Sequence, residues 1–470
     1  MRRLFQLLVC VTPFLLAACG GDDSSDDDTS SSTVTAPSIT VQPSSVSVTE
    51  GESATLTVTA SGSSLSYQWS KDGTAISGAT SATYTISAAT TSDAGSYTVA
   101  VTNSGGSVTS NAATLTVNTG TSSTCADSTY SENVRCAVEA FAATLSSTQL
   151  ASFQYTSASY TSAEIGVYKT RWSNFPVGMV QRAGISYGSL STAQKAAFVA
   201  VARAALTDQG YDDFVAVIAA DDYLATTANG YGSSLYYMAV EGTPDASALW
   251  MLQIGGHHLA FNVSFQGGLA YPTPHHVGVE PKASFTVNGT TYQALASKAS
   301  AMLAIFTGQT DSLSPTSSGS TLLTSAKVSG NYGDVLVGPV EYGTGSYSAV
   351  AAKFPTSDRG LLVSSLSSAQ QALVVEALRQ FVADYDSTTT DRIMGEYTSS
   401  SALAATYVAW TSPSGSVPNV DVNGTYMRID GPQVWIEIAC QNGVVIQGQT
   451  HYHMIYRDKT YDYFNELSSN

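Results

Sequence analysis

Basic residues are scarce in this chain. Lys and Arg number 19 against 36 Asp and Glu in 470 residues, giving a formal net charge of −17. Nucleic-acid binding needs a basic face for phosphate, so this balance excludes nucleic acid as the expected partner. The sequence also lacks a complete nucleophile motif, phosphate-binding loop or cofactor fingerprint. Sequence motifs therefore name no reaction.

The sequence also lacks an apolar run long enough for a transmembrane helix. Its first apolar stretch is informative because it is too short to span a membrane. Arg2 and Arg3 precede an apolar stretch over 4–18, too short for a mature transmembrane helix, that runs into Cys19. The pattern resembles a bacterial lipoprotein signal, which implies cleavage before Cys19 and acylation of its thiol. An ordinary signal peptide is the alternative. We expect an exported protein, lipid-anchored to the cell membrane or outer membrane and facing the periplasm or cell surface.

Loss of residues 1–18 would change the formal charge from −17 to −19, because two arginines leave. Residues 19–36, rich in Ser and Asp, are interpreted as a solvated tether. Cysteine usage suits an oxidising compartment, with Cys125 and Cys136 as the possible disulfide. Cys440 is then an odd thiol, interpreted as a buried spectator rather than a nucleophile.

Residues 37–118 alternate Thr, Val and Ser with apolar positions and carry turn signals, which predicts an antiparallel sandwich. The segment resembles an immunoglobulin-like domain: Trp69 matches the core tryptophan and Tyr97 the tyrosine-corner strand. Val58 and Val99 stand at the two cysteine positions, so packing must replace the disulfide. The resemblance implies a spacer or adhesion module without catalytic residues.

A short linker, 119–124, leads to a larger domain over 125–470. Three Leu-Ser-x-x-Gln segments, at Ser146, Ser191 and Ser367, predict capping boxes that open amphipathic helices. A further helix is expected over 292–306. Strands are expected around 236–241, 250–265, 426–429, 433–439 and 444–457, which gives a mixed α+β domain after an all-β immunoglobulin-like sandwich. The likeness between the segments around 190 and 367 leaves a distant internal duplication as a secondary interpretation.

All six histidines occur in close pairs: His257 with His258, His275 with His276, and His451 with His453. The intervening residue puts His451 and His453 on one face of a strand. Alternation after Gly256 puts His258 and Asn262 on the polar face and His257 on the other face.

Three imidazoles from two strands, His258, His451 and His453, would supply the nitrogen ligands of a zinc, copper or iron centre with one position open. His257 would support the site. Structural histidines bonded to buried polar groups are the alternative.

The expected acid/base and anion-orienting residues are Glu437, Asp458 and Arg457. Glu437 interrupts an apolar strand and needs a partner if it is buried, with Arg428 or Arg457 as the candidates. A two-residue hairpin at Asn442–Gly443 would place Glu437 on the face opposite His451 and His453, and a bulge would reverse this. A buried Arg–Glu pair is the alternative role.

The larger domain resembles the family called domain of unknown function 3500, found in bacteria and fungi. The resemblance rests on motifs such as Trp172-Ser-Asn-Phe-Pro176, Arg182-Ala-Gly184, Gly255-Gly-His-His-Leu259-Ala-Phe-Asn262 and His451-x-His453-x-Ile-Tyr-Arg457-Asp458. It implies no activity, fold or cofactor. The chain departs from the family at His275-His276, where an apolar stretch is expected, so this pair is a weaker ligand candidate.

Two functions remain open from the sequence. The first is an envelope-anchored metal-dependent hydrolase or oxidoreductase of unknown substrate. The second is a non-catalytic surface lipoprotein that binds a small molecule, glycan or surface partner, with structural histidines; its many Tyr, Ser and Thr residues suit such a surface. Convergence of His258, His451 and His453 would favour the first.

Overall fold

We analysed a computed structural model of the chain. It describes residues 34–49, 53–118, 129–161, 167–308, 323–330, 332, 335–336, 350–413 and 417–463. The predicted signal segment, Cys19, most of the tether and Cys125 lie outside the described residues. Cys136 is disulfide-bonded, whereas Cys440 is a buried free thiol whose pKa burial raises to about 12. Within the described ranges, no helix is both long and apolar enough to cross a bilayer.

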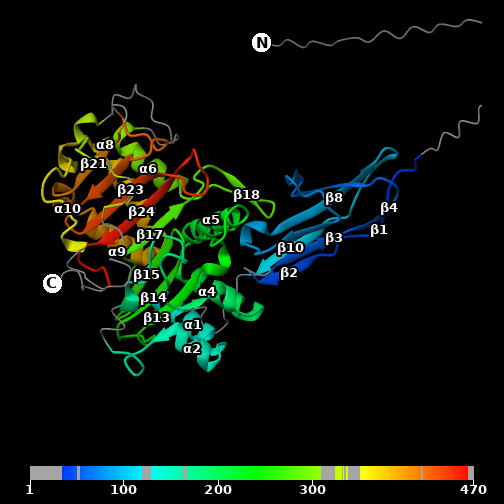
Figure 1. Cartoon of the computed structure of the whole chain (residues 1–470), viewed down its shortest axis with the longest axis horizontal. Helices are drawn as coiled ribbons and strands as arrows, with labels where there is room; N and C mark the ends of the chain where they lie inside the picture. Colours follow the sequence, from blue (N-terminus) through cyan, green and yellow to red (C-terminus); the bar gives the residue numbers. More distant parts are fainter. Residues whose placement is uncertain are drawn as a thin grey trace, which may run out of the picture.

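The first domain is an immunoglobulin-like β-sandwich, as the sequence predicts (Figure 1). Trp69 and Val99 are fully buried, and Val58 is nearly so. The hydroxyl of Tyr97 donates to the backbone oxygen of Asp93 at 2.7 Å, the bond of a tyrosine corner. Apolar packing thus occupies the place of the usual disulfide. Its strands are β1 (Ser38–Val41), β2 (Val46–Thr49), β3 (Ala54–Thr57), β4 (Thr59–Ser61), β5 (Ser66–Lys71), β6 (Thr74–Ala75), β7 (Thr83–Ile86), β8 (Gly95–Asn103), β9 (Gly106–Thr109) and β10 (Ala113–Asn118).

The second domain is built on one sheet of 12 strands. Its main path runs in the order β11-β13-β14-β15-β17-β24-β23-β22-β21-β20, so β24, the last strand that the structure describes, lies in the middle. The strands are β11 (Gln154–Tyr155), β12 (Ile185–Ser186), β13 (Tyr237–Glu241), β14 (Trp250–Gly256), β15 (Leu259–Gln266), β16 (Leu269–Tyr271), β17 (His275–Val279), β20 (Leu361–Leu362), β21 (Tyr407–Thr411), β22 (Tyr426–Asp430), β23 (Val434–Asn442) and β24 (Thr450–Asp458). A separate hairpin joins β18 (Phe285–Val287) to β19 (Thr290–Tyr292).

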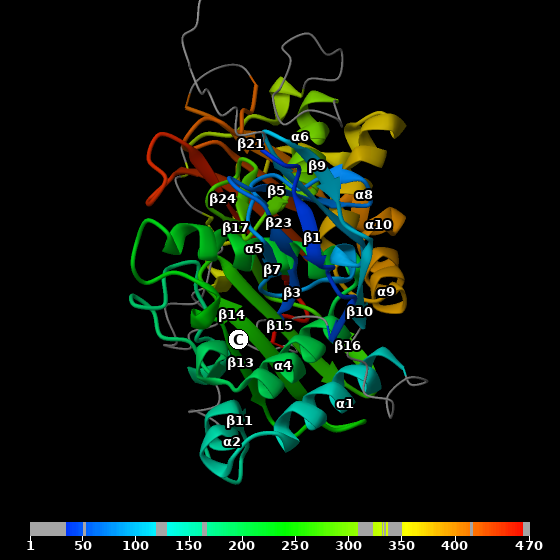
Figure 2. The ribbon, with the colours of Figure 1, turned by 90° about the vertical axis from the view of Figure 1, so that its right-hand side faces the viewer.

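Helices lie along one side of this sheet, with α8, α9 and α10 to its right in Figure 2. The three predicted capping boxes are present at Ser146, Ser191 and Ser367. The helix expected over 292–306 begins later, at Ala296, and ends at Thr307. The helices are α1 (Tyr130–Ala143), α2 (Ser147–Phe153), α4 (Thr192–Ala205), α5 (Asp208–Ala225), α6 (Ala296–Thr307), α8 (Ser368–Val382), α9 (Ser387–Tyr397) and α10 (Ser400–Ala404).

The two halves of the sheet repeat one order of elements. A two-residue strand and a 3-10 turn precede the capping-box helix in both halves, at β12 and α4 and again at β20 and α8. A second helix and an antiparallel meander follow in each half. The halves meet at the antiparallel pair β17 and β24, where His275 lies opposite Tyr456. The likeness noted around 190 and 367 therefore extends to the whole arrangement of the domain.

The two faces of the sheet differ in chemistry. The helix-covered face carries apolar side chains such as Leu252, Phe261 and Met454, which belong to the main hydrophobic core. The other face carries polar side chains that are nevertheless buried: Glu241, Gln253, Asn262, His276, Arg428, Glu437, His451, His453 and Arg457. Burying so many polar groups costs free energy unless they are bonded. This polar face is where the histidines gather.

Candidate metal centre

His257 and His258 form the two-residue turn between β14 and β15. Gly256 pairs with Leu259 across the turn, and His258 has a left-handed φ of 59°. The strand alternation predicted for these two histidines is therefore wrong, because neither residue belongs to a strand. From Leu259 onward the predicted alternation holds: Leu259 and Phe261 join the main core, and Ala260 packs on the other face.

Three buried groups fix this turn. The hydroxyl of Tyr236 donates to the backbone oxygen of His257 at 2.8 Å. Arg182, itself buried, donates from Nη2 to the oxygen of Gly256 at 2.8 Å. The ring of His258 lies against Gly278, where an added Cβ would come within 2.9 Å of its Cδ2. The side chain of His258 is thus held by its surroundings.

His451 and His453 lie on β24 and share one face, as the alternation predicts. Nε2 of His451 is 3.1 Å from Nε2 of His453, which is 3.2 Å from Nε2 of His258. The ligand atoms of all three residues lie within 4.8 Å of one another. Their exposed fractions are 3 %, 1 % and 4 % for His258, His451 and His453. The structure therefore brings together the three residues that the sequence analysis selected as metal ligands.

Protons alone satisfy this trio poorly. A neutral imidazole nitrogen either carries one hydrogen or offers one lone pair. Nε2 of His453 faces two other ring nitrogens, so it can form a hydrogen bond with only one of them at a time. Protonating the rings is costly, because burial lowers the pKa of His258 well below its ordinary value, and the neighbouring histidines lower it further. A cation that accepts three lone pairs would satisfy all three nitrogens.

The opposite nitrogen of His453 has its own neighbour. Nδ1 of His453 lies 3.3 Å from Nδ2 of Asn174. The oxygen and nitrogen of an amide exchange places when the group turns by half a rotation. With Oδ1 inward, Asn174 would accept from Nδ1–H and leave the lone pair of Nε2 available to a metal. Asn174 belongs to the Trp172–Pro176 segment, to which the sequence analysis gave no role at the site.

Asp221, on α5, contacts the turn from the helix side. Its Oδ1 lies 2.6 Å from Nδ1 of His257, whose ring stacks on His258 with centroids 3.7 Å apart. Burial raises the pKa of the Asp221 carboxyl, while His257 acts in the opposite direction. Asp221, His257 and His258 form a second group with ligand atoms within 4.8 Å. A carboxylate that fixes the tautomer of a histidine is the usual support of a catalytic or metal-binding imidazole.

The structure corrects the expected position of Glu437. The loop after β23 is longer than two residues, so Glu437 pairs with Ile455, not Gly448, and shares the face of His451 and His453. Its carboxylate accepts from the hydroxyl of Tyr426 and from the backbone N–H of Leu336. Arg428 lies directly opposite it on β22. Among the described residues, Glu437 belongs to no group whose ligand atoms lie close enough to share a metal. Its bonds to Tyr426 and Leu336 indicate a structural role, and not the expected role of metal ligand or general base.

The roles expected for Asp458 and Arg457 are also corrected. Asp458 faces the helices, where it accepts from the hydroxyl of Tyr397 at 2.7 Å, so it is on the wrong side of the sheet to serve the histidines. Burial raises the pKa of its carboxyl to about 6. Arg457 pairs with Asp462 at 2.7 Å, and both side chains are fully buried. Asp462 thus neutralises the charge of Arg457, so Arg457 is not available to orient an anionic ligand as expected.

The remaining candidates lie beside the trio or away from it. Asn262, which the alternation placed on one face with His258, lies on β15 and bonds other groups: it accepts from the side chain of Gln253 and donates to the backbone oxygen of Pro274, both at 2.7 Å. His275 points into the helix-side core against Phe261. The ring of His276 lies on the site face, 5.8 Å from that of His453.

Arg428 donates to the backbone oxygen of Asp358 at 2.6 Å, away from the histidines. The groups that sequence reasoning missed are Asn174, Asp221 and Arg182. Arg182 and Asn174 stand in motifs that carry the family resemblance, and this was the available signal. For Asp221 the sequence offers no signal, because acidic residues are common in amphipathic helices.

Comparisons with known proteins cover both domains. A family model described as "Protein of unknown function (DUF3500)" matches residues 127–465, and an "Immunoglobulin domain" model matches 36–103. The "Decoration protein" of Escherichia phage T5 is 52% identical over 62 residues, which are 13% of this chain and 38% of that protein.

Solved immunoglobulin-domain proteins show local likeness. A chimeric titin Z1Z2-Z1Z2 tandem is 34% identical over 18% of this chain and 52% of its own, with a TM-score of 0.17. The structure of Sidekick-1 immunoglobulin domains 1-5 is 28% identical over 18% of this chain and 20% of its own chain, also with a TM-score of 0.17. The chain spans about half of the first structure and well under half of the phage protein.

Proposed function

The chain belongs to the DUF3500 family of proteins of unknown function, and we propose that its second domain is a metal-dependent enzyme domain of a lipid-anchored envelope protein. His258, His451 and His453 would bind one divalent transition metal. The observation that supports this most directly is the convergence of their three Nε2 atoms at 3.1 and 3.2 Å.

The spacing fits a small tetrahedral ion. Metal–nitrogen bonds of about 2.0–2.1 Å at tetrahedral angles separate ligand nitrogens by about 3.3–3.4 Å. The two separations that His453 makes, 3.1 Å to His451 and 3.2 Å to His258, are within a few tenths of an ångström of this value. Three neutral imidazoles suit zinc, copper or iron, whereas magnesium and calcium prefer oxygen ligands. Three protein ligands would also leave a fourth position for water or substrate, as in catalytic zinc sites.

His257 and Asp221 supply an acid/base group beside the trio and take the place of the residues expected from the sequence. Asp221 would hold the Nδ1–H tautomer of His257 and leave its Nε2 to accept a proton. A bound divalent cation would acidify a water at the open position. This arrangement favours hydrolysis as the reaction class, with a metal-dependent oxidation as the alternative.

A second candidate function rests on how deeply the histidines are buried. The exposed fractions of the trio are only 1–4 %, so the three rings have little contact with solvent. In this alternative the protein binds a surface ligand, glycan or partner, and its histidines serve structure. A metal with an exchangeable fourth ligand would contradict it, since structural zinc sites are closed by four protein ligands.

Metal analysis of the purified full-length chain tests the proposal. We expect about one equivalent of zinc, copper or iron in the wild type, and its loss from the His451→Ala/His453→Ala double variant. His275→Ala is the matched control, because it removes a buried histidine from the opposite face of the same sheet and should keep the metal. Absence of tight metal from the wild type, or retention by the double variant, would overturn the proposal.

Cobalt substitution then separates catalysis from structure. The visible spectrum of bound Co²⁺ depends on coordination number and on exchangeable ligands. A spectrum that changes on adding azide or cyanide would indicate an open position. A four-coordinate spectrum insensitive to both anions would favour the structural alternative.

A further inference from the structure

A cavity of about 400 Å³ lies between the immunoglobulin-like domain and the second domain. The first domain contributes Ser53 and residues 86–90, which begin at the last residue of β7. The second contributes α4, α5 and the hairpin of β18 and β19, which face the first domain in Figure 1. This volume is near the lower end of pockets that hold small ligands.

Hydrogen bonds between described residues join the domains around this cavity. Nδ2 of Asn288 donates to Oγ of Ser87 at 2.8 Å, and Nη2 of Arg203 donates to Oγ1 of Thr91 at 3.4 Å. Gly289 fits beneath the ring of Tyr84, where an added Cβ would lie 3.2 Å from it. The domains thus touch at the rim and leave the centre of their interface unfilled.

The lining combines aromatic rings with neutral polar groups. Tyr187, Phe198, Tyr211, Phe214 and Tyr292 supply ring surfaces, while Thr192, Asn288 and Thr290 supply hydroxyl and amide groups. Aromatic faces pack on apolar surface, and the polar groups can bond hydroxyls. This combination suits a molecule that has apolar ring faces and a hydroxylated edge.

The charges that line the cavity balance each other. Lys195 lies 5.0 Å over the ring of Tyr187, and Asp222 accepts from the backbone N–H of Ser233 at 2.7 Å. These are one cation and one anion among the described lining residues, and both have protein partners. A ligand with net charge would gain little here, so the cavity favours a neutral ligand.

We propose that this interdomain cavity is a binding site for a neutral mono- or disaccharide. Its ring would pack against the aromatic walls, and its hydroxyls would bond Thr192, Asn288 and Lys195. Because both domains contribute walls, the bound sugar would also hold them in one orientation. Tyr236 lines the same cavity and bonds the backbone of His257, so the sugar would sit next to the histidine turn.

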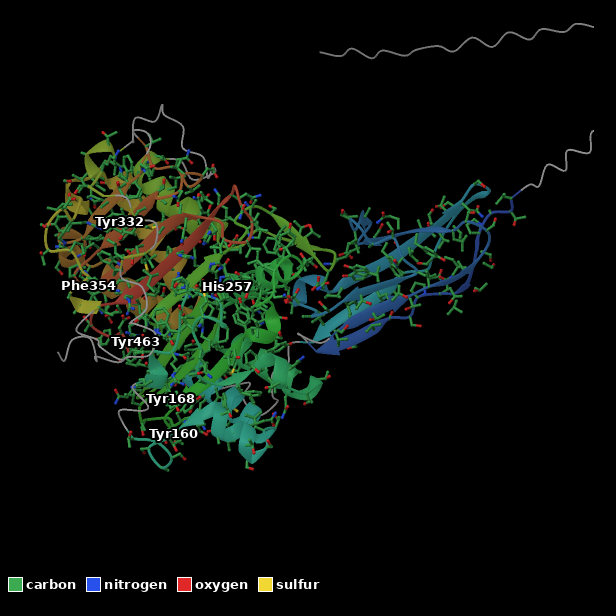
Figure 3. All side chains as sticks on the ribbon, in the orientation of Figure 1. Tyr160, Tyr168, His257, Tyr332, Phe354 and Tyr463 are labelled. Carbon is green, nitrogen blue, oxygen red and sulfur yellow. The ribbon has the colours of Figure 1, made fainter. Side chains whose placement is uncertain are left out.

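Binding of four probe sugars to the full-length chain tests this site. Glucose, N-acetylglucosamine, maltose and cellobiose are titrated by calorimetry and by saturation-transfer NMR. We expect at least one to bind, and Tyr292→Ala to weaken binding about tenfold or more, a loss of about 1.4 kcal/mol. Tyr160→Ala is the matched control, since Tyr160 lies on the far part of the second domain from the cavity (Figure 3).

Lys195→Ala provides a second variant if Tyr292→Ala disturbs its hairpin, because Lys195 lies on a separate helix. The proposal is wrong if none of the four sugars binds below about 10 mM, or if the bound sugar is insensitive to both variants. Preferential binding of decanoate would assign the cavity to an acyl chain instead. The titrations use the full-length chain as purified and measure sugar binding alone, so their outcome is separate from that of the metal analysis.

Discussion

The ring of His258 rests on the backbone of Gly278, leaving no space for a side chain at that position. A Cβ at Gly278 would lie 2.9 Å from Cδ2 of His258 and 2.7 Å from the backbone oxygen of Tyr452. Gly278 also pairs with His453 in the sheet. A glycine on β17 therefore allows an imidazole from one half of the sheet to reach two from the other half.

Gly278→Ala should lower metal affinity about 10- to 100-fold, because the added methyl group displaces His258 from the trio. Competition with a fluorescent zinc chelator measures the affinity. Gly178→Ala is the control: an added Cβ there meets nothing within 4 Å, so affinity should stay unchanged. Equal affinity in both variants would show that His258 is not a ligand.

Asp221→Asn should change the tautomer of His257 and weaken the metal site by about one order of magnitude. The amide no longer attracts Nδ1–H as a carboxylate does, so Nε2–H becomes competitive. Nitrogen-15 NMR of the histidine rings reads the tautomer directly. The neighbouring Asp222→Asn is the matched control, since Asp222 bonds Ser233 instead. An unchanged His257 spectrum in Asp221→Asn would contradict the proposed role.

Arg182→Lys should loosen the site without removing a charge. Arg182 donates to the oxygens of Ser173, Phe175, Val180 and Gly256, and so ties the segment that carries Asn174 to the histidine turn. Lysine cannot span these acceptors with one planar group. We expect the free energy of unfolding to fall by about 2–4 kcal/mol.

Denaturant titration measures that loss for Arg182→Lys. Arg171→Lys serves as its control, since Arg171 lies over the ring of Tyr168 at the edge of the domain. A loss confined to stability, with metal affinity intact, would show that Arg182 supports the fold but does not position the site.

Glu241→Gln should stabilise the protein, and more so as pH rises. Glu241 is buried, and no other described residue forms a hydrogen bond with its carboxylate oxygens. Burial raises its pKa to about 8, although the charge of Lys169 acts in the opposite direction. Between its ordinary pKa and about 8 the folded state holds a proton that the unfolded state has lost, so wild-type stability declines with pH. The advantage of the variant should be small near pH 4, grow to about pH 8 and then level off.

Urea unfolding of Glu241→Gln and the wild type between pH 4 and 9 measures that difference. Glu376→Gln on α8 is the control, because Glu376 is exposed and accepts from the side chain of Gln380 at 2.7 Å. A pH-independent difference for Glu241→Gln would mean that folding does not raise the pKa of Glu241.

Cys19→Ser should release the protein from membranes, because serine offers no thiol for the predicted acylation. Fractionation and metabolic labelling with palmitate measure the change. Cys440→Ser changes a buried free thiol within the fold and should leave the distribution as in the wild type. Membrane retention of Cys19→Ser without label would contradict the lipid anchor.

Local signals predicted much of this fold. The serines of the three capping boxes and the same-face placement of His451 and His453 depend on residues a few positions apart, so sequence alone reveals them. The immunoglobulin-like core around Trp69 was likewise predictable. Such short-range patterns set the elements and the identity of the trio.

Long-range contacts account for what the sequence did not show. The loop between β23 and β24 is held by Glu280, whose Oε1 accepts from the backbone N–H groups of Val445 and Ile446. That distant contact fixes the register of Glu437, which the Asn442–Gly443 hairpin misplaced. Asp221 reaches His257 only because α5 packs on the sheet there. Such neighbours are set by tertiary packing, to which no local pattern points.

The central place of β24 has a consequence for biosynthesis. This strand follows the other described strands of the sheet along the sequence, yet it joins the two halves of the sheet and carries two of the three converging histidines. A nascent chain can fold its immunoglobulin-like domain early, but the two half-sheets keep open edges until β24 has been made. The histidine trio therefore marks closure of the sheet: a chain truncated before Thr450 would keep only His258 and two unpaired half-sheets.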